Sequence, residues 1–146
     1  GFSELDGNVR AYGVGNHRHD PEIRQALNLP PSTPFIFIPH LLPMVRGILS
    51  TMQVAFARPL GDADLQEIYE AAYSAAPFVR VLPAGKLPEL RRVVGTPNAE
   101  IGFVRLDEGR RAVVVCVIDN LLKGAASQAV QNFNRMFDRP EEEGLR

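Results

Sequence analysis

The chain has 146 residues, 45% of them hydrophobic, and its 16 basic and 17 acidic side chains give a net charge of −1. The length suits one compact domain, and the balanced charge excludes the strong positive field with which proteins attract nucleic acid or anionic membranes. The longest apolar stretches are too short to span a bilayer, one cysteine excludes an intrachain disulfide framework, and no secretory leader is expected. We therefore expect a soluble cytoplasmic domain over residues 1–146, with neither nucleic acid nor membrane as a partner.

The first elements predicted along the chain are a short strand and a helix. Residues 9–14 favour a strand that ends in glycines suited to a tight turn. A helix is expected to begin at Asp20, because its carboxylate can accept from the free amides of a first turn and Pro21 suits the first helical position. The prolines that follow at 30, 31 and 34 cannot continue this helix.

The middle of the chain predicts two strands and a second helix. Residues 35–38 are β-favouring and apolar on both faces, which predicts a buried strand, and residues 48–57 predict another strand with its predecessor as the candidate partner. Asp62 is expected to cap a helix that packs its apolar face on the sheet. That face contains Leu65, Ile68, Tyr69, Ala72 and Ala76.

The last third of the chain predicts three strands and a final helix. Strands are expected over 78–82 and 100–106, and Asp107-Glu108-Gly109 is a hairpin signal into a central strand over 111–118. The final helix, about 122–136, has apolar residues at helical spacing. Together these elements predict an α+β fold, with a mixed, largely antiparallel sheet and helices packed on one face.

His17 and His19 are the first candidates for chemistry. In an extended backbone two residues separated by one position point to the same side, so both imidazoles can address one ligand. His19 lies just before the predicted helix, whose free amides and positive dipole end favour a neutral imidazole and an anion such as phosphate. Because the unperturbed pKa of histidine is about 6.5, either side chain suits a general acid/base.

Other interpretations of these histidines stay open. Two histidines in a surface loop need no functional explanation. A metal site using His17 and His19 with Glu22 or His40 lacks a fourth ligand at a recognisable spacing, so no metal is expected. A cysteine-histidine pair is also disfavoured, because Cys116 lies in a predicted buried strand, where burial raises the pKa of the thiol.

A second candidate site is the strand-to-helix junction at 118–126. Free helix amides and polar loop residues converge at such junctions, which makes them common ligand sites. The residues fit a simple capped helix equally well, with Asp119 or Asn120 as the cap. Arg46 is a further candidate, because a guanidinium can bind a carboxylate or phosphate with two hydrogen bonds, although a lone arginine is more often a surface or ion-pair residue.

The same stretches resemble the N-acetyl-γ-glutamyl-phosphate reductase family. The resemblance extends over almost the whole chain in several ordered motifs. These are Ala11-Tyr12, the His-Arg-His-Asp-Pro-Glu-Ile sequence at 17–23, and the segments 39–48, 77–81, 119–126, 128–132 and a glutamate-rich stretch closing on Gly144-Leu145.

The resemblance implies an enzyme of which this chain is only the C-terminal part. Members of the family have an N-terminal Rossmann domain that binds NADP and supplies a nucleophilic cysteine, and then a substrate-binding and oligomerisation domain that resembles the C-terminal domain of glyceraldehyde-3-phosphate dehydrogenase. The implied reaction converts N-acetyl-glutamyl phosphate, through a cysteine thioester, to the semialdehyde and phosphate in arginine biosynthesis. A homodimer or homotetramer is implied, and this fragment alone is expected to be inactive.

The resemblance also implies roles for individual residues. His19 is the first choice for the general acid/base, with His17 as its neighbour. Tyr12, Arg46 and Glu22 are implied on the substrate side. Asn120, Lys123 and Gly124 are implied to face the nicotinamide of NADP, which the missing N-terminal domain mainly binds.

The chain departs from the family pattern at three places, and two other functions stay open. Asp20 stands where the family usually has threonine, Ser127 where it has glycine, and Phe137-Asp138 where a glycine is expected. The negative charge of Asp20 would repel a phosphate. The motifs also fit a reductase of the related aminoadipyl phosphate in lysine biosynthesis, and the domain could serve oligomerisation without catalysis.

Overall fold

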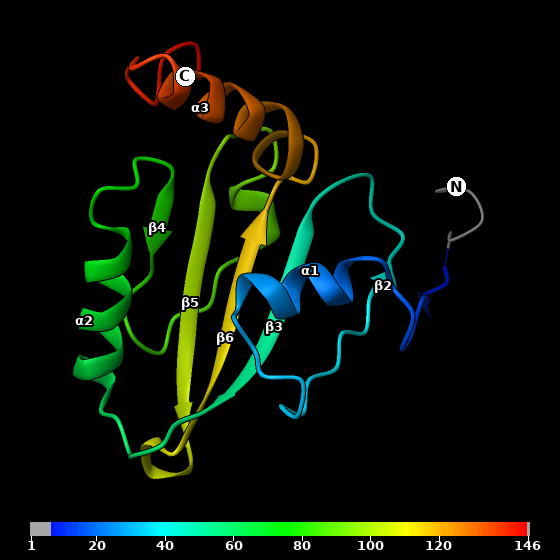
Figure 1. Ribbon diagram of the computed structural model, residues 1–146, viewed down its shortest axis with the longest axis vertical. Helices are drawn as coiled ribbons and strands as arrows, with labels where there is room; N and C mark the ends of the chain where they lie inside the picture. Colours follow the sequence, from blue (N-terminus) through cyan, green and yellow to red (C-terminus); the bar gives the residue numbers. More distant parts are fainter. Residues whose placement is uncertain (1–6, 146) are drawn as a thin grey trace. The chain divides into compact units, whose positions relative to one another are not determined.

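The computed structural model describes residues 7–145, which divide between Val45 and Arg46 into two compact units (Figure 1). The first unit contains a two-stranded antiparallel sheet of β1 (Arg10–Ala11) and β2 (His40–Leu41), together with helix α1 (His19–Ala26). The strand predicted over 9–14 is therefore much shorter than expected. The prediction of a single domain over 1–146 stays a prediction.

The prediction of a buried strand at 35–38 is wrong. This segment is extended but forms no strand, and its side chains alternate, with Phe35 and Phe37 half-buried and Ile36 and Ile38 exposed. Arg24 explains part of the difference, because its guanidinium donates to the carbonyl of Phe35 at 3.0 Å and lies over the Phe35 ring. Arg24 therefore occupies a carbonyl that a strand ladder would need.

The predicted start of α1 is also wrong. The helix begins at His19, Arg18 is the residue before its first turn, and no side chain of Arg18 caps it. Asp20 lies inside the first turn and pairs with Arg24 one turn later, with 2.9 Å between Oδ2 and Nε. Pro21 consequently occupies the third helical position rather than the first.

The second unit is built on a four-stranded sheet in the order β3-β6-β5-β4. Its neighbours are antiparallel except for the parallel pair of β4 and β5, which confirms the mixed, largely antiparallel sheet. The strands are β3 (Ile48–Ala55), β4 (Val79–Val81), β5 (Ala99–Leu106) and β6 (Arg111–Ile118). The central place of β6 is as predicted, whereas β3 pairs with β6 and not with residues 35–38.

Helix α2 (Asp62–Tyr73) covers one face of this sheet (Figure 1). Leu65 packs there against Ile101, Phe103, Ala112 and Val114, and Tyr69 stacks on Phe103 with 5.6 Å between ring centroids. Of the predicted apolar face, Ile68 is exposed. Asp62 is not the cap, because the helix is preceded by Gly61, whose N–H donates to Asp64.

Three short helical turns and a final helix complete the second unit. The β5–β6 hairpin turns through η3 (Asp107–Gly109), where three consecutive residues have positive φ, and the connection before β5 contains the short helix η2 (Leu90–Arg92). After β6, the chain forms a π-helical turn, η4 (Leu122–Ala126), that continues into α3 (Ser127–Met136).

Helix α3 lies beyond the end of the sheet at which β6 finishes, rather than on the face that α2 covers (Figure 1). Its buried residues are polar: Ser127, Gln131 and Asn134. Of the apolar residues predicted at helical spacing, Leu122 is half-buried, whereas Ala126, Ala129, Val130 and Phe133 are exposed, and Met136 in the last turn of α3 is 78% exposed as well. The helix therefore presents its hydrophobic side to solvent, the reverse of an ordinary amphipathic surface helix.

Candidate functional site

The structure brings His17 and His19 together at the start of α1. Their ring centroids are 4.8 Å apart at an interplanar angle of 72°, and both side chains are half-buried. The His17 ring also meets Tyr12 edge-on at 5.3 Å and Phe37 at 5.2 Å. His17, His19 and Tyr12, three of the five residues assigned to this site from the sequence, thus form one aromatic cluster.

His17 is held in place by a backbone hydrogen bond. The N–H of His19 donates to Nδ1 of His17 at 3.2 Å, which assigns the proton of a neutral His17 to Nε2. A turn formed by Gly13 and Asn16 precedes it, and a Cβ on Gly13 would lie 2.9 Å from Cδ2 of His17. Glycine at this position therefore lets the imidazole lie close against the turn.

His19 is the freer of the two imidazoles. Within residues 7–145 neither of its ring nitrogens forms a hydrogen bond, and no hydrogen bond or ion pair joins Glu22 to either histidine. The predicted role of Glu22 as an orienting partner stays a prediction. The His40 side chain is exposed on strand β2, where the residue pairs with Ala11 of β1, and its Nδ1 lies near the carbonyl of Ile38. No group of three or more possible metal ligands occurs among the described residues.

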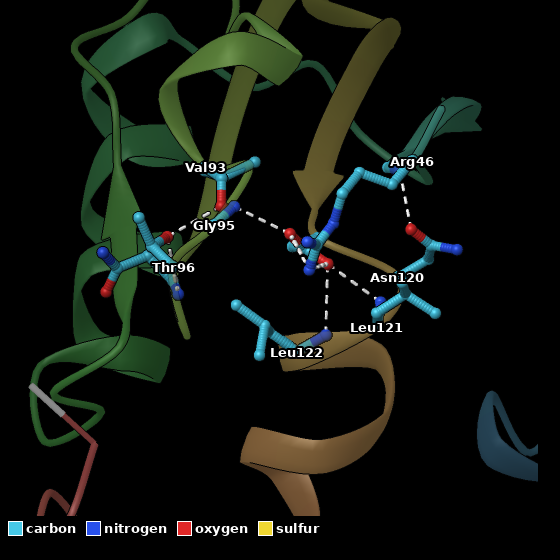
Figure 2. A network of polar contacts seen from close by, with 10 residues as sticks. Arg46, Val93, Gly95, Thr96, Asn120, Leu121 and Leu122 are labelled. Carbon is cyan, nitrogen blue, oxygen red and sulfur yellow. Dashed lines mark hydrogen bonds and ion pairs between the residues drawn. The ribbon is translucent and has the colours of Figure 1, made fainter. Parts of the chain in front are cut away.

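The second candidate site is organised by a buried carboxylate, Asp119. Its side chain is completely buried, and its two oxygens accept from four residues (Figure 2). Oδ1 accepts from the backbone N–H groups of Leu121 at 2.9 Å and Leu122 at 3.1 Å, and Oδ2 accepts from the N–H of Gly95 at 2.7 Å. Nη2 of Arg46 lies 2.9 Å from Oδ1 and 2.8 Å from Oδ2.

These donors control the ionisation of Asp119. Burial by itself would raise the pKa of the carboxyl, but the hydrogen bonds from Gly95, Arg46, Leu121 and Leu122 together lower it to about 2. The carboxylate is therefore ionised at neutral pH. The simpler interpretation of this junction, in which Asp119 caps the following turn, is confirmed by the bonds to Leu121 and Leu122.

Arg46 and Asn120 are both engaged within the same junction. The guanidinium of Arg46, for which the sequence proposed an anion contact, is turned toward Asp119, and its Nε is buried without a hydrogen-bond partner among the described residues. Oδ1 of Asn120 accepts from the N–H of Gly47 at 2.6 Å (Figure 2). The amide NH2 of Asn120 is the part of the side chain that this contact leaves available as a donor.

Lys123 points toward helix α3. Its Nζ donates to Oε1 of the buried Gln131 at 2.6 Å and lies 5.9 Å from the centre of the Phe78 ring. Burial lowers the pKa of Lys123, and the nearby charge of Glu141 opposes that shift. Gln131 in turn donates to Glu141 at 2.7 Å, so a polar chain links Lys123 to the C-terminal segment.

The backbone around Lys123 and Gly124 is a π-helical turn. The N–H of Gly124 donates to the carbonyl of Asp119, and that of Ala126 to Leu121, both five residues back. Such turns are rare and occur frequently at functional sites. The residues that the sequence placed on the cofactor side, Asn120, Lys123 and Gly124, therefore lie on one irregular segment, but the histidine cluster belongs to the other unit.

Sequence reasoning missed Gly95 and Gln131 as parts of this junction. Gly95 is 24 residues from Asp119 along the chain, in a loop that Thr96 shapes by accepting from Asn98 and donating to Val93. The sequence does contain one sign of this junction: an aspartate directly follows a run of apolar strand residues, where its carboxylate must find buried hydrogen-bond donors.

The surface hollow of about 460 Å³ beside β4, lined by Tyr73, Pro77 and Arg80, contains none of the predicted site residues.

Comparison with known proteins decides the family. Residues 1–120 match the family described as "Semialdehyde dehydrogenase, dimerisation domain". The chain belongs to this family. The matched residues end at Asn120, and η4 and α3 follow them in the chain.

Curated relatives of this dimerisation domain confirm the resemblance proposed from the motifs. The N-acetyl-gamma-glutamyl-phosphate reductase of Pelotomaculum thermopropionicum is 47% identical over 99% of this chain and 42% of its own length. The enzyme of the same name from Laribacter hongkongensis is 49% identical over the same shares. The chain thus spans about 42% of the length of these relatives.

A solved structure confirms the α+β fold. Aspartate semialdehyde dehydrogenase II from Vibrio cholerae superposes with a TM-score of 0.55 over 68% of this chain and 29% of that one, at 22% identity. At this identity the likeness concerns the fold alone. No helix among residues 7–145 is long and apolar enough to cross a membrane.

Proposed function

We propose that this chain is the C-terminal part of an NADP-dependent reductase that converts N-acetyl-glutamyl 5-phosphate to N-acetyl-glutamate 5-semialdehyde and phosphate. The family match and the two reductases at 47% and 49% identity support this proposal. The observation that carries it within the structure is the His17–His19 pair, in which one imidazole is held by the backbone and the other has free ring nitrogens.

His19 is the proposed general acid/base. In the acyl-phosphate reduction the thiol of a cysteine from the rest of the protein loses its proton and attacks the acyl carbon, and phosphate leaves. After a hydride reaches the resulting thioester, the former carbonyl oxygen takes up a proton, and it releases that proton when the thiolate leaves and the semialdehyde forms. A half-buried imidazole without a competing hydrogen bond can give and accept that proton. The ring of His17 contacts the rings of both His19 and Tyr12, and the polar atoms of His17 and Tyr12 are proposed to contact the substrate.

Glu22 and Arg46 are proposed as further contacts to the substrate. Glu22 is exposed on α1, one turn after the first helical residue, so substrate contact is its proposed role. Arg46 is proposed on the substrate side through the edge of the guanidinium that Asp119 does not bind, since its side chain remains 31% exposed.

The residues at 120–124 fit a nicotinamide carboxamide. Because Oδ1 of Asn120 is committed to Gly47, the side chain can offer its NH2 to a carbonyl oxygen. Lys123 and Gly124 lie on the same π-helical turn, whose irregular backbone is suited to a close ligand approach. When bound, NADPH would supply the hydride, and the chain's contribution would be to hold the nicotinamide end in position.

The outward apolar stripe of α3 supports a missing partner domain. Val130, Phe133, Met136 and Phe137 lie exposed in succession, and the rings of Phe133 and Phe137 are 4.5 Å apart. An exposed apolar patch of this kind marks an interaction surface. We assign this stripe to the cofactor-binding domain of the same protein, because it lies on the helix that directly follows the turn proposed to face the nicotinamide.

The decisive assay uses phosphate-dependent NADP reduction with N-acetylglutamate semialdehyde. The 146-residue chain alone should show no turnover, and turnover without an added domain would contradict the proposal. In the full-length protein His19→Ala should lower kcat by about 100-fold or more. His40→Ala is the comparison variant, because the His40 side chain is exposed and its ring contacts none of Tyr12, His17 and His19 among the described residues, and it should change kcat by less than about twofold.

A dimer is proposed as a second role of the same domain, because the matching family is described as a dimerisation domain. Sedimentation of the 146-residue chain should give a dimer at micromolar concentration, and a monomer there would contradict this role. If His19→Ala retained activity within a few-fold of wild type, assembly rather than catalysis would be the domain's function.

The related lysine enzyme is distinguished from the arginine reductase by the substrate it prefers. Comparing rates with the glutamyl and aminoadipyl semialdehydes in the full-length protein separates the two.

A further inference from the structure

We propose that Asp119 is a positioning residue that sets the conformation of the turn at 120–124 and joins it to the corner at residues 46 and 47. The inference rests on the proposed function in one respect, because the turn contains the residues proposed to contact the nicotinamide. Its structural part stands on the contacts of Asp119 alone. The sequence assigned Asp119 only a possible role as a helix cap, and it assigned none to Gly95.

Asp119 does more than cap a helix. A cap needs only the bonds to Leu121 and Leu122, which are the first free amides of the following turn. Asp119 also binds Gly95, from the loop before β5, and Arg46, from the residues before β3. Three segments that are distant in sequence therefore converge on one carboxylate.

A carboxylate is the only common side chain of this size that satisfies all these donors. Both of its oxygens accept, and neither donates. An asparagine could keep its oxygen toward Leu121 and Leu122, but its NH2 would then face the N–H of Gly95 and the guanidinium of Arg46. That arrangement leaves buried donors opposite one another without an acceptor between them.

The contacts next to Asp119 transmit its position to the turn. The backbone carbonyl of Asp119 accepts from Gly124, and the side chain of Asn120 accepts from Gly47. Because the carboxylate holds residues 119–122 against Arg46 and Gly95, it also fixes the positions at which the Gly124–Asp119 and Gly47–Asn120 hydrogen bonds form. A nicotinamide would meet a prearranged Asn120, which reduces the ordering that binding itself must supply.

Two substitutions at Asp119 and a matched control test the structural part. In Asp119→Ala, amide hydrogen exchange of the full chain should become faster at Leu121 and Leu122, whose N–H groups bind the Asp119 carboxylate. Exchange should also become faster at Gly47 and Gly124, although their N–H groups bind other acceptors. Asp119→Asn should release Gly95 first. Asp62→Asn removes an exposed aspartate paired with Arg105 and should leave all five amides unchanged. Unchanged protection of Gly47 and Gly124 in Asp119→Ala would overturn the proposal.

Kinetics of the full-length protein test the functional part. Asp119→Asn should raise KM for NADPH by about tenfold and KM for the acyl phosphate by a clearly smaller factor, because Asp119 holds the whole turn at 120–124 but only one side of the Arg46 guanidinium, which is proposed on the substrate side. Equal KM values for wild type and variant, or parallel rises for both substrates, would overturn the positioning role. If the wild-type protein showed no reductase activity, the proposed function would fail, and the exchange experiment would still decide the role of Asp119.

Discussion

Arg46 and Asp119 lie 73 positions apart in sequence and form an ion pair through one guanidinium nitrogen. Nη2 of Arg46 lies 2.9 Å from Oδ1 and 2.8 Å from Oδ2 of the carboxylate. The carboxylate is fully buried, whereas the guanidinium is partly exposed. The pair joins the start of β3 to the end of β6, so the two ends of neighbouring antiparallel strands are closed by a charge interaction.

Removal of Arg46 should destabilise the second unit. Arg46→Ala leaves a buried carboxylate with only backbone donors, and we expect a loss of about 2 kcal/mol in the free energy of unfolding, measured by urea denaturation. The matched control is Arg105→Ala, because Arg105 pairs with the exposed Asp62 at 3.1 Å. That change should cost less than about 1 kcal/mol. Equal losses in the two variants would contradict the special place of Arg46.

Stability should fall at acid pH through Asp119. Its pKa is about 2 in the folded chain against a reference value of 3.8, so its stabilising contribution is complete above pH 4 and disappears as pH falls through about 2. The contribution is on the order of 2 kcal/mol. Urea unfolding at pH 4, 3 and 2 measures it. Asp119→Asn has no such proton to bind, so it should lack this part of the acid loss; identical pH profiles would refute the assignment.

Gly109 should tolerate no side chain, whereas Gly85 should tolerate one at modest cost. Both have positive φ, 91° and 79°, but a Cβ on Gly109 would lie 2.2 Å from the carbonyl oxygen of Leu60, and a Cβ on Gly85 meets nothing within 4 Å. Gly85→Ala should therefore cost about 1 kcal/mol, from backbone conformation alone. Gly109→Ala should cost at least about 2 kcal/mol more. Thermal or urea unfolding of the pair would show the difference.

Cys116 should react slowly with alkylating reagents. Its thiol is half-buried on β6 and burial raises its pKa, so little thiolate is present at neutral pH. Iodoacetamide at pH 7.5 should modify the native chain at least about tenfold more slowly than the urea-unfolded chain. Rapid modification of the folded chain would reopen the possibility that Cys116 is a nucleophile.

Local chemistry in the sequence predicted the elements of the second unit well. The apolar run at 111–118 became the central strand β6, the Asp-Glu-Gly sequence at 107–109 became the β5–β6 hairpin, and the alternation of elements predicted the mixed sheet. These features depend on side-chain periodicity and backbone preferences within a few residues. Such signals are present in the sequence whatever the rest of the chain does.

The errors concern choices that depend on distant partners. Residues 35–38 have the composition of a buried strand, but Arg24 takes the Phe35 carbonyl, and β3 pairs with β6 instead. Asp20 and Asp62 both have capping chemistry, yet each lies inside its helix and pairs with an arginine. Propensity identifies a helix start within a few residues, but it does not decide whether a given aspartate caps the helix or pairs with an arginine instead.

The sequence by itself determined the residue types of the candidate site: a pair of histidines before a helix, and an Asp-Asn pair after a central strand. Only the tertiary structure decided what those residues do. It gave the His17 ring a backbone hydrogen bond and left the His19 ring without one among the described residues, and it brought Arg46 and Gly95 together on Asp119. The physical reason is that a buried charge or imidazole must satisfy its hydrogen bonds from whatever donors the fold brings near, and those donors come from positions that sequence spacing does not connect.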